Sequence, residues 1–288
     1  MNDLKNQIVN LKKTIFKISN NPKKSEIQNQ DLSFKTFVLI GLVSGIETLA
    51  QRYVHYGLPK NELNNYIATG ETLKGFQGTQ EDWNLIDQDS LADAVNLYHT
   101  IVKQSEPFED ILSLLAEDIL LTKGRGVAKG QFMTPPYIAQ FLAKLIYSPK
   151  DTSEPHKFCD PCVGYGALML AHLWNQHKEN PESLKNIEII VNDIDPFMCH
   201  VTALQILANT TQNNIDVKSF QILCSNVITQ YTSGETSFLL NFITPEIVFS
   251  RIDEIQTIKL VQDLMREVLV GQPTKNKSRD SEISVGAV

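Results

Sequence analysis

Two short segments combine the end of an apolar run with residues that could hold a polar ligand. The first, DPCVGYG, starts with the carboxylate of Asp160 and continues through Pro161 to a turn that contains Gly164 and Gly166. Because glycine has no side chain, such a turn lets the backbone approach a ligand closely. By itself this pattern is nearly as typical of a tight turn that binds nothing.

The second segment, NDID, follows the β-branched run IEIIV further along the chain. In nucleotide-binding sheets, an acidic residue at the end of the second strand accepts hydrogen bonds from ribose hydroxyls, and Asp193 is placed for that role. Asp195 comes directly before Pro196 and is better explained as the N-cap of a helix. Together, the two segments predict a nucleotide-type site more strongly than either one does.

The elements that would position these residues alternate along the chain. Strands are expected over residues 157–159, 187–191 and 219–223, and helices over 167–178 and 196–210. Strand–helix–strand alternation is typical of a parallel, doubly wound sheet, so Asp160, Asp193 and Asn226 would each follow a strand of that sheet.

The N-terminal part reads as helical. Apolar residues recur at helical spacing over residues 6–18, and further helices are expected over 34–56, 82–103 and from 106 to about 121. We find no strand pattern before about residue 155. We therefore predict a helical N-terminal domain (1–122), an α/β domain (123–272) and a disordered tail (273–288).

Charge and composition exclude some classes of protein. A net charge of −7 argues against a surface that binds nucleic acid everywhere, but not against a local basic groove. Lysines and arginines cluster over residues 5–24, 123–129 and 275–279, where solvated surface residues are at least as good a reading.

The sequence favours a cytoplasmic protein that is not inserted in a membrane. We find no export signal, and the most apolar stretch, residues 36–50, is short and carries Glu47, so it predicts a buried helix. Four cysteines without a disulfide pattern fit a reducing compartment. Cys159 and Cys162 form a C-x-x-C pair, but it lies inside the glycine turn and the other two cysteines are isolated, so no metal site is expected.

Four segments in a fixed order carry a resemblance to a known family. EPFEDIL, GQFMTPP, CDPCVGYGALML and NDIDPFMCHVTALQI, within about residues 105–250, resemble the adenine-N6 DNA methylases related to the modification subunits of type I restriction–modification systems. The short phage and prophage versions look closest. The resemblance implies a Rossmann-like S-adenosylmethionine-dependent methyltransferase sheet, apparently shortened here and preceded by an all-helical N-terminal domain.

The resemblance also implies roles for particular residues. In this family the threonine of a G-Q-F-x-T-P-P segment contacts the methionine end of S-adenosylmethionine. The end of the third strand usually carries an acidic residue that accepts a hydrogen bond from the adenine amino group, and the amide oxygen of Asn226 can still accept one without charge. The implied cofactor-binding residues are Gln131, Phe132, Thr134, Asp160, Pro161, Gly164, Gly166, Asp193 and Asn226.

The tetrad TPPY, Thr134 to Tyr137, differs in one residue type from the N/D/S-P-P-Y/F/W tetrad with which such enzymes hold a flipped base. Only about two dozen residues separate it from DPCVGYG, too few for the strands that a permuted enzyme would need between them. We therefore assign TPPY to the cofactor pocket. No such tetrad follows Gly166, so the catalytic residues are unknown.

Two functions remain open. The first is a DNA adenine-N6 methyltransferase that transfers methyl from S-adenosylmethionine to adenine in DNA. The second is a catalytically inactive methyltransferase-like module that binds S-adenosylmethionine and DNA or a partner subunit. A methyltransferase for another substrate is less favoured. In each case DNA is an expected partner, and the helical N-terminal domain is the expected contact for a partner subunit.

Overall fold

The computed structural model describes residues 2–73, 77–121, 134–147, 155–230 and 237–270. Residues 1–248 form one compact unit and residues 249–288 a second. The predicted tail, 273–288, and the predicted boundary near residue 122 lie outside the described residues. The division into two domains therefore stays a prediction.

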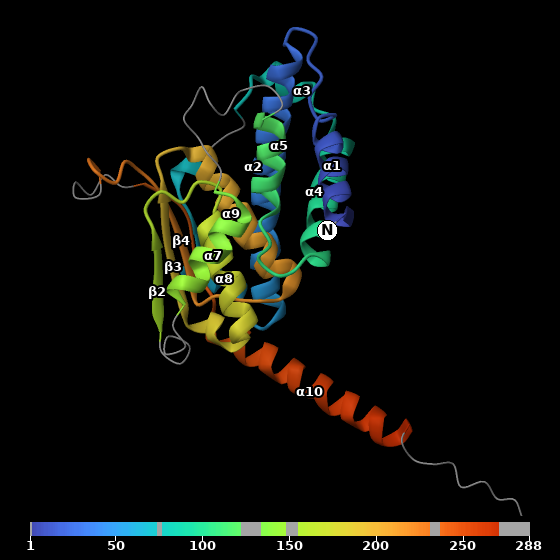
Figure 1. The fold of residues 1–288 in the computed structure, drawn as a ribbon, viewed down its shortest axis with the longest axis vertical. Coiled ribbons are helices and arrows are strands. Elements are labelled where there is room, and N and C mark those ends of the chain that lie inside the picture. The colour runs from blue at the N-terminus through green and yellow to red at the C-terminus, as the bar shows by residue number, and fades with distance from the viewer. Residues whose placement is uncertain (1, 74–76, 122–133, 148–154, 231–236, 271–288) are drawn as a thin grey trace, which may run out of the picture. The chain divides into compact units, whose positions relative to one another are not determined.

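Figure 1 shows the order of helices and strands along the chain. The strands are β1 (Ile67–Thr69), β2 (His156–Asp160), β3 (Ile187–Asp193), β4 (Ser219–Cys224) and β5 (Ser237–Ile243). The α-helices are α1 (Asn2–Ile15), α2 (Glu26–His55), α3 (Gln80–Asn84), α4 (Gln88–Gln104), α5 (Ile111–Leu121), α7 (Pro136–Ile146), α8 (Ala167–Glu179), α9 (Pro196–Asn213) and α10 (Glu246–Val270).

The strands form one mixed sheet in the order β1-β5-β4-β3-β2. The predicted strands β2, β3 and β4 are parallel, with Phe158, Ile189 and Phe220 side by side. β5 pairs antiparallel with β4, and β1 antiparallel with β5. The expectation of a purely parallel sheet is therefore wrong.

Two strands were not predicted from the sequence. β1 lies in the part expected to be helical, but its three residues are too few to show a period. In β5, buried Leu239 and Leu240 are adjacent instead of alternating with exposed residues, and a register shift in the β4–β5 pair accompanies this. The helix expected over 82–103 is also interrupted, because Asp87 caps a new helix by accepting a hydrogen bond from Ser90 N (3.0 Å).

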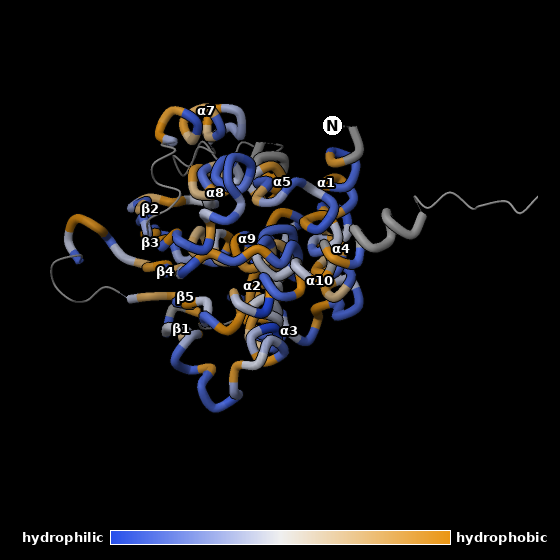
Figure 2. Tube along the Cα trace, turned by 90° about the horizontal axis from the view of Figure 1, so that it is seen from below, coloured by the Kyte–Doolittle hydropathy of each residue, from blue (hydrophilic) through white to orange (hydrophobic). Residues whose placement is uncertain are grey.

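Within residues 1–248, the described helices that pack on the sheet lie on one of its faces, which corrects the expectation of a doubly wound fold (Figure 2). β2, β3 and β4 are neighbours in sequence order, and α8 and α9 connect them. Because such parallel crossovers are nearly always right-handed, successive steps in one direction along a sheet place their helices on the same face.

α9 is the most deeply buried helix of the layer that covers the sheet. Fourteen of its 18 residues are buried. α2 packs against it through Gly41 and Gly45, where a Cβ atom would lie 3.2 Å and 3.3 Å from the side chains of Leu204 and Leu207. α2 is long and apolar enough to cross a membrane by length and composition, yet 56% of its most apolar window is buried inside the protein. Its packing is that of the core helix predicted from the sequence.

An ion pair joins the last turn of α2 to the segment before β4. Arg52 Nη1 and Nη2 each donate to one oxygen of Asp216, both at 2.6 Å, and both residues are buried. The guanidinium also lies 5.3 Å from the ring centroid of Tyr56. The bidentate hydrogen bonds of this ion pair fix the position of α2 relative to the sheet.

We predict that Arg52→Ala destabilises the chain by about 3–5 kcal/mol, because it leaves the Asp216 carboxylate buried without a counter-charge. The measurement is urea unfolding followed by circular dichroism. Arg251→Ala, which removes an exposed i,i+3 pair with Glu254, is the control and is expected to cost less than about 1 kcal/mol. Equal losses in both variants would contradict the structural role of the buried pair.

Candidate functional site

The carboxyl ends of the parallel strands bring Asp160 and Asp193 to the same edge of the sheet. Asp160 ends β2 and Asp193 ends the neighbouring β3, as the sequence predicts. Burial raises the pKa of Asp160, and the negative charge of Asp193 raises it further, against a lowering by the backbone N–H of Cys162. Asp160 Oδ1 accepts that hydrogen bond at 3.0 Å.

The glycine turn after β2 takes a conformation that favours glycine at two positions. Gly164 has φ +57° and Gly166 has φ +93°. A Cβ atom on Gly164 would meet nothing within 4 Å, whereas one on Gly166 would lie 3.3 Å from Thr202 Oγ1. Open space therefore adjoins the backbone at Gly164, and the helix α9 lies close behind Gly166.

Asp193 holds this turn from the neighbouring strand. Gly164 N donates to Asp193 Oδ2 and Asp195 N donates to Asp193 Oδ1, both at 2.9 Å. Since a carboxylate oxygen has two lone pairs, each keeps the capacity to accept one more hydrogen bond. Asp195 caps α9 through Phe197 N (2.9 Å), which confirms the sequence interpretation of that residue.

Three further side chains hold the turn, and the sequence analysis did not single them out. Thr202 Oγ1 donates to Gly164 O and Gln205 Nε2 to Tyr165 O, both at 2.8 Å. Asn192 Nδ2 donates to Pro161 O and Ser225 O, both at 3.0 Å, and so ties the ends of all three parallel strands. The place of Asn192 in NDID could have indicated it, whereas Thr202 and Gln205 only interrupt an apolar helix.

Asn226 lies at the end of the third parallel strand, where the sequence places it. Its side-chain oxygen accepts from Ile228 N at 3.0 Å and Thr229 N at 3.3 Å. Its backbone N–H donates to Gln230 Oε1 at 2.7 Å. The oxygen thus stabilises its own turn, and any ligand that binds it has to share or replace these bonds.

The TPPY segment opens α7. Thr134 is half-buried, Pro135 is the N-cap and Pro136 the first helical residue, a position that suits proline because its missing N–H has no helical partner. Tyr137 is 70% exposed. Gln131 and Phe132, which the family resemblance implies as cofactor-binding residues, lie outside the described residues.

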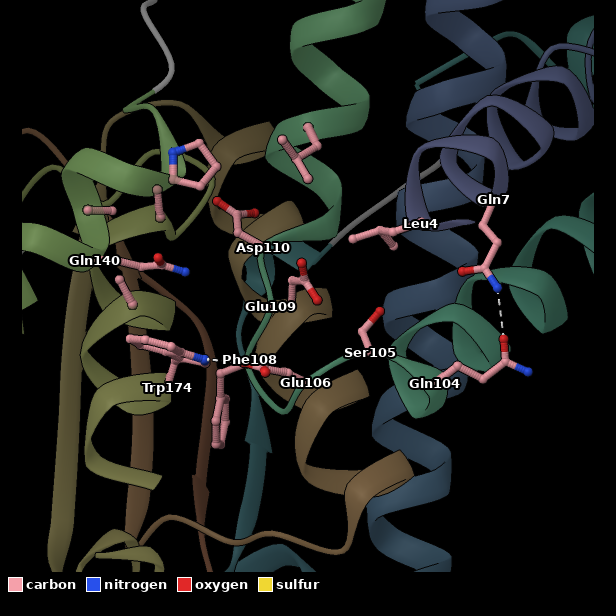
Figure 3. A pocket seen from close by; sticks show the side chains of 15 residues that line it. Leu4, Gln7, Gln104, Ser105, Glu106, Phe108, Glu109, Asp110, Gln140 and Trp174 are labelled. Atoms are coloured by element: carbon pink, nitrogen blue, oxygen red, sulfur yellow. Dashed lines mark hydrogen bonds between the residues drawn. The ribbon is translucent and has the colours of Figure 1, made fainter. Parts of the chain in front are cut away.

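A cavity of about 400 Å³ lies beside the starts of α7 and α8 (Figure 3). Asp160, Gly164 and Asp193 are not part of its lining, so this cavity and the glycine turn are different places. The lining residues are Leu4, Gln7, Gln104, Ser105, Glu106, Phe108, Glu109, Asp110, Leu114, Pro136, Ala139, Gln140, Ala167, Ala171 and Trp174.

The cavity wall is acidic and is linked to the glycine turn through α9. Asp110 Oδ1 accepts from Gln205 Nε2 at 2.8 Å and from Ser113 N at 3.1 Å, while its buried Oδ2 has no hydrogen-bond partner. Burial raises the pKa of Asp110 and of Glu109. Glu106 accepts from Trp174 Nε1 at 2.8 Å. Because Gln205 bonds both Asp110 and Tyr165 O, it bridges the two places.

The C-x-x-C pair of the turn is not joined. Cys159 and Cys162 are both free and exposed. Within the described parts of the chain, no group of three or more His, Cys, Asp and Glu side chains is arranged to hold a metal ion.

Comparison with known proteins assigns the family. Residues 108–250, about half of the chain, match the family described as N-6 DNA Methylase, and they include the glycine turn, Asp193 and Asn226. The chain belongs to the N-6 DNA methylase family.

One solved structure is similar at low sequence identity. It is a modification subunit assigned to a type I restriction enzyme from Vibrio vulnificus YJ016, with a TM-score of 0.42 and 12% identity. The match covers 78% of this chain and 56% of that one, so this chain spans little more than half of that protein's length. The comparison with curated proteins found no match.

The raised pKa of Asp160 gives a test with a defined sign. Folding raises the pKa of the Asp160 carboxyl. The stability of the fold therefore falls as the pH rises from the pKa of the unfolded chain to the higher pKa of the folded chain. At a pH where Asp160 is protonated in both the folded and the unfolded chain, the carboxyl has no such effect. We therefore expect Asp160→Asn, which keeps an oxygen facing Cys162 N, to be more stable than the wild type at pH 7. The difference should disappear at about pH 3, below the ordinary pKa of aspartate.

Thermal unfolding at both pH values measures this effect. Asp87→Asn is the control, because hydrogen bonds from Ser90 lower the pKa of Asp87 and its charge favours the folded state. The control should gain no stability at pH 7. If the wild type is at least as stable as Asp160→Asn at pH 7, ionisation of Asp160 does not destabilise the folded chain.

Proposed function

We propose that this chain binds S-adenosylmethionine at the glycine turn and acts as a DNA adenine-N6 methyltransferase. One observation carries the proposal: Asp193 and the Gly164 backbone are hydrogen-bonded at 2.9 Å, beside open space at Gly164. Membership in the N-6 DNA methylase family supports the same assignment.

The residues at the carboxyl edge fit the polar parts of this cofactor. Asp193 would accept hydrogen bonds from the ribose hydroxyls with the lone pairs that Gly164 N and Asp195 N leave free. Asp160 and the turn would hold the ribose and methionine portions, and Thr134 the methionine end. Because Thr202, Gln205 and Asn192 hold the turn, little ordering of the backbone would oppose binding.

The chemistry requires positioning above all. S-adenosylmethionine supplies a methyl group that its sulfonium makes electrophilic. The protein has to hold an extruded adenine with its amino nitrogen directed at that methyl. Asn226 would accept a hydrogen bond from the adenine of the cofactor only after sharing its oxygen with Ile228 N and Thr229 N.

A second function follows from a different observation. After β4 the described chain turns back into antiparallel β5 and reaches α10, with no N/D/S-P-P-Y/F/W tetrad on the way. A chain without a group for the target amino nitrogen could bind S-adenosylmethionine and DNA, or a partner subunit, without catalysis. This inactive module is the alternative to the enzyme.

We predict that Asp193→Ala weakens S-adenosylmethionine binding at least about tenfold, since hydrogen bonds to charged groups contribute about 1.5–3 kcal/mol. Asp193→Asn should give an intermediate loss, because the asparagine amide keeps one acceptor oxygen where aspartate has two, and that oxygen carries no charge. Isothermal titration calorimetry measures both, with exposed Asp253→Ala as the control. Equal affinity in all four proteins would place the cofactor elsewhere.

Thr134→Ala separates the two interpretations of TPPY. If Thr134 holds the cofactor, the variant loses affinity for S-adenosylmethionine and keeps its affinity for DNA, measured by fluorescence anisotropy. A selective loss of DNA affinity would instead make TPPY a base-holding tetrad.

A methyl-transfer assay tests whether the chain is an active enzyme. The assay measures transfer of labelled methyl from S-adenosylmethionine to unmethylated DNA, and nucleoside analysis identifies the labelled base. We expect label in N6-methyladenine. Cofactor binding without any transfer would identify the inactive module, or an enzyme that requires a second chain.

A further inference from the structure

The buried side chain of Gln205, on α9, uses both of its amide hydrogens in hydrogen bonds to other segments. Its Nε2 donates one hydrogen to Asp110 Oδ1 and the other to Tyr165 O, both at 2.8 Å. Its Oε1 accepts from Leu112 N at 3.1 Å. The amide group is planar and has only these two hydrogens to donate. A movement of Asp110 would therefore turn the amide and displace the donor that faces Tyr165 O.

The loop of residues 105–110, the α5 entry loop, leads from α4 into α5. Phe108 has φ +64°, a left-handed backbone conformation that is unfavourable for a bulky residue. Its N–H donates to Asn209 Oδ1 at 2.6 Å, and Glu106 accepts from Trp174 Nε1 at 2.8 Å (Figure 3). A strained conformation persists only when the surrounding contacts define it. Contacts with α8 and α9 therefore hold the α5 entry loop in a defined position.

Asp110, the last residue of the α5 entry loop, joins α5 to Gln205. Its Oδ1 accepts from Ser113 N at 3.1 Å, as the oxygen of an N-cap residue does. The same oxygen accepts from Gln205 Nε2. α5 in turn packs against α1, at the start of the chain. The position of the helical N-terminal part is therefore transmitted to Gln205 through a single buried carboxyl group.

At its other contact, Gln205 acts on the middle of the glycine turn. Tyr165 lies between Gly164 and Gly166, the two residues of the turn with positive φ. The bond from Gln205 orients the carbonyl of Tyr165, and Thr202 Oγ1 orients the carbonyl of Gly164, each at 2.8 Å. Because glycine permits many backbone conformations, a turn with two glycines keeps one conformation only if its peptide groups are held.

We propose that Gln205 is a positioning residue that couples the α5 entry loop to the glycine turn, so that the helical N-terminal part sets the affinity of the turn for S-adenosylmethionine. The identity of the ligand rests on the proposed function. Gln205 is 0% exposed, so it acts through Tyr165 O and not by contact with the cofactor. A turn already held in its binding conformation binds a ligand without the cost of ordering the backbone. By linkage, cofactor binding would stabilise the loop in turn.

Calorimetry with S-adenosylmethionine on the full chain measures this coupling through Asp110→Ala, a change outside the glycine turn. We expect Asp110→Ala and Gln205→Ala each to weaken binding about tenfold, within the usual range of coupling between two sites. In the double variant, Asp110→Ala should add no further loss, because its effect passes through Gln205. If Gln205→Ala does not fold, as judged by circular dichroism, Asp110→Ala still decides the proposal: unchanged affinity overturns it.

Two variants separate positioning from a general loss of stability. Asp110→Asn keeps an oxygen for Ser113 N and Gln205 Nε2, so this conservative change should retain the affinity that Asp110→Ala loses. Thr210→Val is the matched control on α9. Thr210 is also buried, but its hydroxyl donates within the helix, to Leu207 O at 3.0 Å. The control should bind S-adenosylmethionine as the wild type does. A loss in Thr210→Val as large as that in Asp110→Ala would overturn the proposal.

Hydrogen exchange of the chain without cofactor, followed by nuclear magnetic resonance, tests the same coupling independently of the ligand. Gly166 N donates to Val163 O at 2.9 Å inside the turn. We expect Asp110→Ala and Gln205→Ala to speed exchange of the Gly166 amide about tenfold, as a local opening does, and to leave the amides of β3 unchanged. Exchange that is equally slow in Asp110→Ala and the wild type would contradict the coupling.

The two measurements distinguish failure of this inference from failure of the proposed function. If the wild type does not bind S-adenosylmethionine but Asp110→Ala speeds exchange at Gly166, the coupling of loop and turn is supported and the proposed function fails. If the wild type binds the cofactor and neither affinity nor exchange responds to Asp110→Ala, the proposed function stands and the coupling fails.

Discussion

Gly41 and Gly45 let α2 lie directly against α9, and α9 in turn lies against the sheet. Added side chains at these glycines would press on Leu204 and Leu207, within 3.3 Å. Thr202 and Gln205 of α9 donate hydrogen bonds to the carbonyls of Gly164 and Tyr165. A shift of α9 would therefore move the glycine turn. The close approach of two helices, reinforced by the buried Arg52–Asp216 pair, thus maintains the geometry of the glycine turn.

Among the described residues, the contacts that hold the glycine turn come from one side, where β3 and α9 lie. Asp193, Asn192 and α9 fix the turn from the β3 side, through hydrogen bonds that need no ligand. On the opposite side β2 is the last of the described strands, and Tyr137, Phe141 and Leu145 of α7 are exposed. The same one-directional strand order explains both features, since it places the helices on one face and leaves the strand before the glycine turn at the edge.

Much of the site could be predicted because its signals are local. A β-branched run followed by NDID, and a short strand followed by two glycines, each specify a strand end and a turn within a few residues. Parallel pairing of those strands then brings Asp160 and Asp193 together, as the structure has them. Gln131 and Phe132 remain predictions. Asn226 is where the sequence places it, but the bonds from Ile228 N and Thr229 N depend on the conformation of the following turn.

The sequence by itself determined the alternation of strands and helices after residue 155, the glycine turn and the capping of α9 by Asp195, because backbone preferences over a few residues set these features. Only the tertiary structure decided that β1, from the N-terminal part, joins the sheet beside β5, and that β5 runs antiparallel. It also decided that β2 lies at the edge and that Thr202 and Gln205 face the turn. These features depend on contacts between residues far apart in sequence, which leave no periodic pattern in either segment.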